Sequence, residues 1–235
     1  MASDKLPERS SRSDIDAFLT KAASLPVTKP AGQTGRLICA MDATARRVPT
    51  WDHACQIQAE MFAETAALGG LEIQLCYYRG FKEFKASGWL RDTASLQRQI
   101  AAVRCLGGHT QIGRVLKHAA TEAKQQRIDA LVFVGDCIEE DVDDICQLAG
   151  VLGIHGVPAF TFHEGGNARA ARAFRQIAQL TKGAYCPFDA ASAHELRDLL
   201  SAVAVYAAGG RDALQRLGQR RGETVRRLSR KIEKG

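Results

Sequence analysis

The feature that most constrains the fold is a repeated alternation between short apolar runs and longer stretches of helical period, which begins at Arg36. Such alternation is typical of βαβ units wound around a parallel sheet. The apolar runs are brief and apolar on both sides, as strands covered by helices on both faces are. We therefore predict an α/β fold with a doubly wound, mostly parallel, six-stranded sheet and helices on both faces.

The pattern predicts five parallel strands, at residues 36–41, 71–78, 130–134, 158–162 and 183–187. A sixth segment, 81–86, alternates after a glycine and is predicted to be an antiparallel edge strand. Helices are expected near residues 52–68, 93–106, 111–126, 139–152, 167–181 and 192–207. Together these elements define one predicted domain, residues 36–208.

The segments on either side of this domain differ from it in composition. Residues 1–35 are polar with one short helical pattern, and we expect a flexible lead-in. The net charge of +6 comes from residues 209–235, because the rest of the chain has 23 basic and 23 acidic residues. This basic, helical tail has three candidate uses: packing on the domain, docking on an acidic partner, or contacting nucleic acid or lipid.

Composition also bears on the compartment. The apolar runs are far shorter than the ~20 residues of a membrane-spanning helix, and residues 1–10 lack an apolar signal region. The seven cysteines are widely spaced and form no C-x-x-C pair, which favours reduced core thiols over zinc or disulfide chemistry. We therefore expect a cytoplasmic protein that is not inserted in a membrane.

Polar residues follow three of the predicted elements. Asp42, Thr44 and Arg46 come after the first strand, the segment 107–113 precedes a helix, and Asp136 follows the strand at 130–134. In an open parallel sheet, ligands bind at the carboxyl ends of the strands where the strand order reverses. We therefore expect these loops to form one polar site.

The three segments resemble the metal-ion-dependent adhesion site of von Willebrand factor A (VWA) domains, which combines D-x-[ST]-x-S, G-T-x-[IL]-G and an Asp after the fourth strand. The resemblance covers roughly residues 36–208, and its most characteristic piece is the sequence Thr110-Gln111-Ile112-Gly113. It implies a Rossmann-like VWA fold and an intracellular adaptor that recognises proteins and catalyses no reaction.

The resemblance also implies a site for Mg²⁺ or Mn²⁺, because hard divalent cations prefer oxygen ligands. Thr44 and Thr110 would bind the cation directly, and Asp42 and Asp136 mainly through water. An acidic side chain of the partner protein would fill the remaining position.

Arg46 departs from the family pattern, which has a hydroxyl ligand at this position. A guanidinium has only donors and cannot bind a cation. Turned inward, Arg46 would pair with Asp42 or Asp136 and replace the metal; turned outward, it would leave a weaker site with four ligands. His109, Arg47 and Asp52 are expected at the rim of the site.

Simpler structural roles remain open for the same residues. Asp42 and Thr44 suit a turn, Thr110 suits a helix N-cap, and the acidic run from Asp136 to Asp144 suits the solvated start of a helix. Two other functions also remain open. A metal at Asp42 and Asp136 could activate water for phosphoester hydrolysis, although no nucleophile or general base is evident. Residues 209–235 could bind nucleic acid.

Overall fold

The computed structural model describes residues 17–18, 20–22, 33–44, 70–188, 198–210 and 212–217. The predicted helix at 52–68 lies outside these residues, as do Arg46, Arg47 and Asp52. Most of the predicted lead-in and tail also lie outside them.

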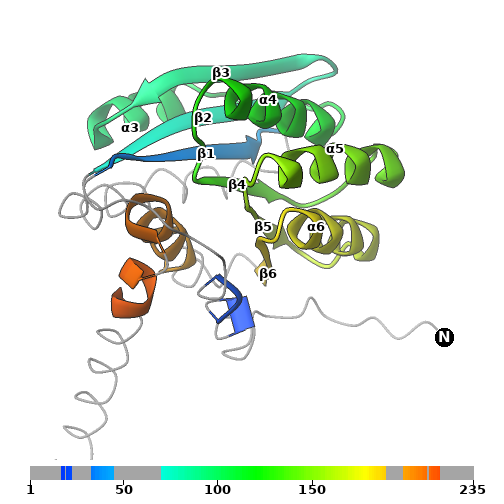
Figure 1. The fold of residues 1–235 in the computed structure, drawn as a ribbon. Helices are drawn as coiled ribbons and strands as arrows, with labels where there is room; N and C mark the ends of the chain where they lie inside the picture. The colour runs from blue at the N-terminus through cyan, green and yellow to red at the C-terminus, as the bar shows by residue number, and fades with distance from the viewer. Residues whose placement is uncertain are drawn as a thin grey trace, which may run out of the picture.

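A six-stranded sheet forms the centre of the described fold, in the order β3-β2-β1-β4-β5-β6 (Figure 1). All neighbours are parallel except β2 and β3. This confirms the predicted fold class. The strand bounds are β1 Gly35–Asp42, β2 Leu71–Arg79, β3 Glu83–Leu90, β4 Ala130–Gly135, β5 Ala159–Glu164 and β6 Ala184–Phe188.

The edge strand β3 begins two residues later and ends four residues later than predicted. Gly80 adopts a positive φ of 57°, and residues 80–82 form the turn that reverses the chain. Beyond it, pairing with β2 continues as far as Leu90, opposite Ile73. The partner strand therefore extends β3 past the alternating segment that is visible in the sequence.

The numbered helices of the described chain are α3 Thr93–Ala101, α4 Ile112–Gln125, α5 Val142–Ile154 and α6 Ala168–Leu180. Residues 198–210 and 212–217 are helical as well. Helix α5 starts three residues later than predicted because Asp141 caps it, its carboxylate accepting from the amides of Asp143 and Asp144. Helix α3 ends before residue 106 because Leu106 instead bonds to two other loops: its amide donates to Ala43 and its carbonyl accepts from Gly80.

Two apolar cores lie on opposite faces of the sheet. Alternate residues of β1 enter different cores: Leu37 lies on one face, and Ile38 lies on the other under α4, α5 and α6 (Figure 1). Both side chains are fully buried, and each such burial is worth about 1.5–3 kcal/mol. A central sheet covered on both faces leaves its strand ends as the natural place for a site.

Parts of both flanking segments pack into the core that contains Leu37. Phe18 is 2% exposed, and its ring centroid lies 5.7 Å from that of Phe160 and 5.5 Å from that of Phe162. Leu214, in the predicted tail, is also buried there. The described part of each flank is therefore anchored to the domain, whereas the predicted domain bounds themselves remain a prediction.

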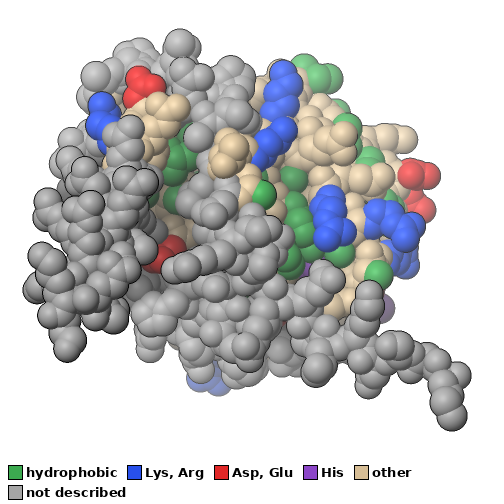
Figure 2. Space-filling model, turned by 90° about the horizontal axis from the view of Figure 1, so that it is seen from below, with side chains coloured by type: hydrophobic (Ala, Val, Ile, Leu, Met, Phe, Trp, Pro, Cys, Tyr) green, Lys and Arg blue, Asp and Glu red, His purple; other side chains and the backbone are tan. Residues whose placement is uncertain are grey.

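Figure 2 shows how charged side chains are distributed on one face of the molecule. On the face seen in Figure 2, Lys and Arg side chains of the described residues stand in small separate groups among hydrophobic, acidic and other side chains. Among the described helices, none combines the length and apolar character needed to cross a membrane.

Six cysteines belong to the described residues, and all are free thiols. Cys39, Cys76 and Cys186 are buried in the cores, as predicted. Cys105 is partly buried and packs against the core that contains Leu37. Cys137 and Cys146 are partly buried outside both cores, so the core-thiol prediction is wrong for these two.

Candidate functional site

The candidate site lies where the strand order reverses. The chain passes from β1 to β2 on one side and later returns to β4 on the other side of β1. Asp42 is the last residue of β1, and Asp136 directly follows Gly135, the last residue of β4. Two carboxylates that are 94 positions apart in the sequence therefore meet at one edge of the sheet.

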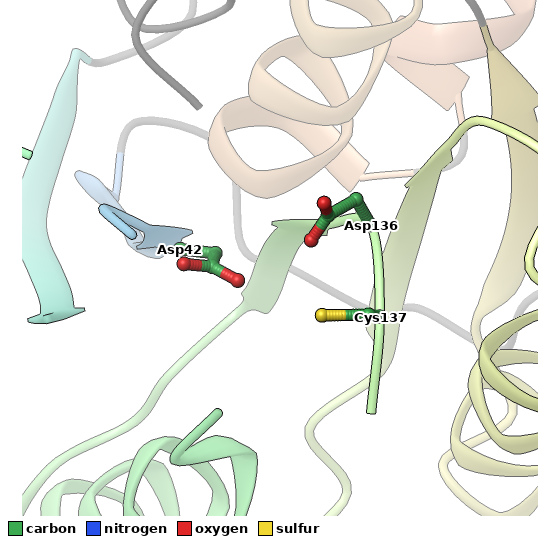
Figure 3. Close-up of side chains that lie close together, drawn as sticks. All are labelled: Asp42, Asp136 and Cys137. Atoms are coloured by element: carbon green, nitrogen blue, oxygen red, sulfur yellow. The ribbon is translucent and has the colours of Figure 1, made fainter. Parts of the chain in front are cut away.

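Asp42, Asp136 and Cys137 form a compact cluster (Figure 3). Each offers one ligand atom, and these three atoms all lie within 4.8 Å of one another. Asp42 is 0% exposed, and its Oδ1 accepts a 2.8 Å hydrogen bond from the amide of Thr44. Asp136 Oδ1 is buried and accepts no hydrogen bond from any described residue. Cys137 was not among the predicted site residues, although its position next to Asp136 was a signal.

This arrangement is electrostatically costly without a cation. A buried carboxylate oxygen without a donor loses its hydration, and a second carboxylate nearby adds repulsion. Burial first, and then the charges of Asp136 and Asp42, raise the pKa of the Cys137 thiol to about 12. The negative field that has this effect also attracts a cation. Carboxylate and hydroxyl oxygens suit a hard divalent ion, so the residues present fit the expected group.

The two threonines lie in loops that are tied to the same cluster. Thr44 is buried and held by its bond to Asp42. The Thr110 hydroxyl accepts from the amide of Glu139 at 2.9 Å, and the Thr110 amide donates to Glu139 Oε2 at 3.0 Å. Thr110 is not the N-cap of α4, because that position belongs to Gln111. Its hydroxyl keeps a second lone pair that could serve a cation.

Glu140 caps helix α4 from a different loop. Its carboxylate accepts from the amides of Ile112 at 2.6 Å and Gly113 at 2.8 Å. Negative charge is favourable there for two reasons. The first amides of a helix have no acceptor within the helix, and the helix dipole is positive at its N-terminus. We expected the acidic run to be only the solvated start of a helix, and Glu140 shows that this expectation is wrong for part of the run. Gly113 is explained as well, since a Cβ there would lie 3.1 Å from Glu140 Oε1.

An exposed rim, consisting of Phe81, Leu106 and His109, borders the site. The His109 side chain is 63% exposed; its Nδ1 lies 2.9 Å from Glu139 Oε2 and its ring packs edge-on against Phe81. Phe81 is 71% and Leu106 54% exposed. Of these three, the sequence singled out only His109, because an exposed apolar residue carries no motif.

Two buried side chains support the cluster from neighbouring strands. Tyr78 lies opposite Asp42 in the register of β1 and β2, is fully buried, and interacts with the Asp42 side chain. Burial, and next the charge of Asp42, hold the pKa of Tyr78 well above its usual range. On β5, His163 Nε2 lies 3.3 Å from the carbonyl oxygen of Asp136. Strand register, which the sequence does not display, brings both residues here.

No known family profile matches this chain, and no curated protein matches its sequence. Several solved structures do match its fold. A von Willebrand factor type A protein from Catenulispora acidiphila has a TM-score of 0.57 at 16% identity, over 72% of this chain and 42% of that one. The SpRpn10 VWA domain has a TM-score of 0.54 at 15% identity, over 75% and 97% of the two chains.

A third match is the vWF domain of the type V pili tip protein Mfa5 from Porphyromonas gingivalis. Its TM-score is 0.60 at 12% identity, over 76% of this chain and 97% of that one. This chain thus spans less than half of the first of these proteins but nearly all of the other two domains. The strand order, the antiparallel edge pair and these matches together show that the described chain has the von Willebrand factor A fold.

Proposed function

We propose that the carboxyl edge of this sheet is the protein-recognition surface of an adaptor domain, and that a divalent cation there connects the domain to an acidic side chain of its partner. Asp42, Thr44, Thr110 and Asp136 would hold the cation, Mg²⁺ or Mn²⁺. The cation would supply a positive charge that a partner carboxylate can bind. The protein residues would position it and leave one coordination position open.

The observation that carries the proposal is the paired carboxylates. Asp42 and Asp136 offer oxygens within 4.8 Å of each other, and Asp136 Oδ1 has no hydrogen-bond donor among the described residues. No ion pair within the described chain includes Asp136. A cation taken up from solution would provide the missing charge.

The exposed rim supports recognition of a protein over recognition of a small ion alone. Phe81 and Leu106 present large apolar side chains to solvent. Phe81 packs against His109, which precedes Thr110. The Leu106 amide donates to the carbonyl of Ala43, which follows Asp42. Exposed apolar residues next to a polar centre are typical of protein contact surfaces. A partner segment with an acidic residue flanked by apolar residues would suit both parts of this edge.

Thermal unfolding with and without excess Mg²⁺ or Mn²⁺ tests the cation. At a hundred times its dissociation constant, a bound ion should stabilise the chain by about 2.7 kcal/mol. The comparison should include Arg46→Ser, which restores the family's hydroxyl, and Asp136→Asn, which should abolish the shift. A shift only in Arg46→Ser would mean that Arg46 replaces the metal in the natural chain. If neither the natural chain nor Arg46→Ser responds, the cation proposal is wrong.

The roles expected for Arg46, Arg47 and Asp52 remain predictions, because these residues lie outside the described part of the chain. A cytoplasmic location also remains a prediction, supported by six free thiols among the described cysteines.

The two other functions that the sequence left open predict different experimental results. A hydrolase would release phosphate from a model ester in a metal-dependent way, and Asp136→Asn would abolish that release. Nucleic-acid binding through residues 209–235 would weaken steeply with salt and vanish when that segment is deleted.

A further inference from the structure

The side chain that distinguishes this cluster from an all-oxygen cation site is Cys137. Its Sγ and the carboxylate of Asp136 both extend from the end of β4 toward the side where Asp42 lies (Figure 3). The sulfur belongs to the same set of ligand atoms within 4.8 Å as the two carboxylate oxygens. A thiol is thus placed where a cation at this edge would meet it.

Other described cysteines have different surroundings. Cys39, Cys76 and Cys186 lie among apolar side chains of the two cores. On α5, the thiol of Cys146 donates to the side-chain oxygen of Gln176 at 3.6 Å. Of these five, only Cys137 belongs to a group with two carboxylates.

One buried polar atom of the cluster has no partner in the described part of the chain. Asp136 Oδ1 is inaccessible to solvent and has no hydrogen-bond partner among the described residues. The fully buried Tyr78, opposite Asp42 in the strand register, interacts with Asp42 and leaves Asp136 Oδ1 without a described donor. Unsatisfied buried polar atoms are rare in folded proteins and call for an explanation, such as a missing ion.

We propose that Cys137 is itself a ligand of this site and makes the site selective for a thiophilic divalent cation, such as Zn²⁺, over Mg²⁺. This inference rests on the proposed function, because it concerns the same cation site. The sulfur forms a bond to the metal as the thiol proton leaves to solvent. For such an ion, Asp42 and Asp136 bind directly in place of Thr44 and Thr110, and an open position remains for a partner carboxylate.

The chemistry of the donor set explains the selectivity. Mg²⁺ is bound by oxygen and keeps several waters, whereas Zn²⁺ accepts both thiolate and carboxylate. At typical zinc bond lengths, two ligand atoms of a tetrahedral ion lie roughly 3.5 Å apart. Three atoms already within 4.8 Å of one another reach that spacing with small side-chain rotations. A thiolate in the set therefore favours zinc-like ions.

Co²⁺ is a suitable probe because a sulfur ligand gives it a charge-transfer absorption band in the near ultraviolet. The full chain should show this band when titrated with Co²⁺, and Zn²⁺ should remove it while excess Mg²⁺ should not. Cys137→Ser should lose the band and bind Zn²⁺ at least about 10-fold more weakly. Cys146→Ser, which changes a partly buried thiol outside the cluster, should keep both.

The outcomes separate this inference from the proposed function. Co²⁺ binding without the band, or a band that persists in Cys137→Ser, would refute the thiol ligand while leaving an oxygen-ligand site intact. Failure of Co²⁺, Zn²⁺ and Mg²⁺ alike to bind would refute both. If Cys137→Ser does not fold, as judged by its unfolding midpoint, the charge-transfer band decides the question: a band in both the natural chain and Cys146→Ser supports the thiol ligand, and Co²⁺ binding without a band refutes it.

Discussion

The two edges of the sheet hold their carboxylates in different ways. At the amino edge, Glu72 of β2 is bonded by Arg36 at 2.8 Å and by Arg91 at 2.6 Å. At the carboxyl edge, Asp136 has a second carboxylate and a thiol as neighbours, and one of its oxygens is buried without a donor.

A third carboxylate, Glu140, shows that the carboxyl edge does not lack donors altogether. It belongs to the same loop as Asp136, yet two backbone amides of α4 satisfy it. The difference suggests a rule: carboxylates that the chain itself satisfies are structural, and the one it leaves incomplete is available to a ligand. Three substitutions test this rule.

The largest effect is expected for Glu140→Ala. The change removes two charge-assisted hydrogen bonds from the start of α4, and such bonds contribute about 1.5–3 kcal/mol. We expect the free energy of unfolding, measured in urea, to fall by about 2–3 kcal/mol. Asp143→Ala, an exposed acid in the first turn of α5, is the control and should cost less than ~0.5 kcal/mol. Equal losses in both variants would contradict a structural role that is specific to Glu140.

Asp136→Asn should change stability in the opposite direction. Without a cation, the amide removes a negative charge next to Asp42, and this should stabilise the chain by about 1 kcal/mol. The same variant should lose all stabilisation by added metal ions. Asp144→Asn, at an exposed position, should do neither. A metal-free Asp136→Asn that is clearly less stable than the natural chain would mean that Asp136 is structural after all.

Glu72→Gln should give the smallest effect, and one that depends on pH. Burial alone would raise the pKa of Glu72, but hydrogen bonds and charges from Arg91 and Arg36 outweigh it and lower the pKa. The stabilisation is therefore complete above the unfolded pKa of about 4.3 and disappears as pH falls through the lower folded value. Glu72→Gln should lose about 1 kcal/mol or less at pH 7 and show a shallower loss of stability in acid. Unfolding in urea between pH 7 and pH 3 measures both, and an unchanged acid profile would contradict the ion-pair explanation.

Much of this fold is visible in local patterns. The apolar runs and helical periods predicted all six strands and their order of appearance, because burial on both faces of a sheet requires apolar residues throughout each strand. The predicted boundaries deviated where a distant loop or capping residue decided them, as at Asp141 and at the bonds of Leu106. Asp42 and Asp136 could be proposed together because strand ends in a parallel sheet share an edge.

Other features depend on distances that no local pattern encodes. Cys137 belongs to the cluster because it follows the end of β4, and Tyr78 lies next to the cluster because of the register of β1 with β2. Glu140 caps α4, and not the helix that follows it in sequence, because packing brings the loop after β4 to the N-terminus of α4. Residue types and their spacing thus predicted which elements form and which strand ends meet, since both follow from hydrophobic periodicity. Which carboxylates are satisfied and which remain open for a ligand became visible only in three dimensions, because hydrogen bonds depend on contacts within about 3 Å between distant segments.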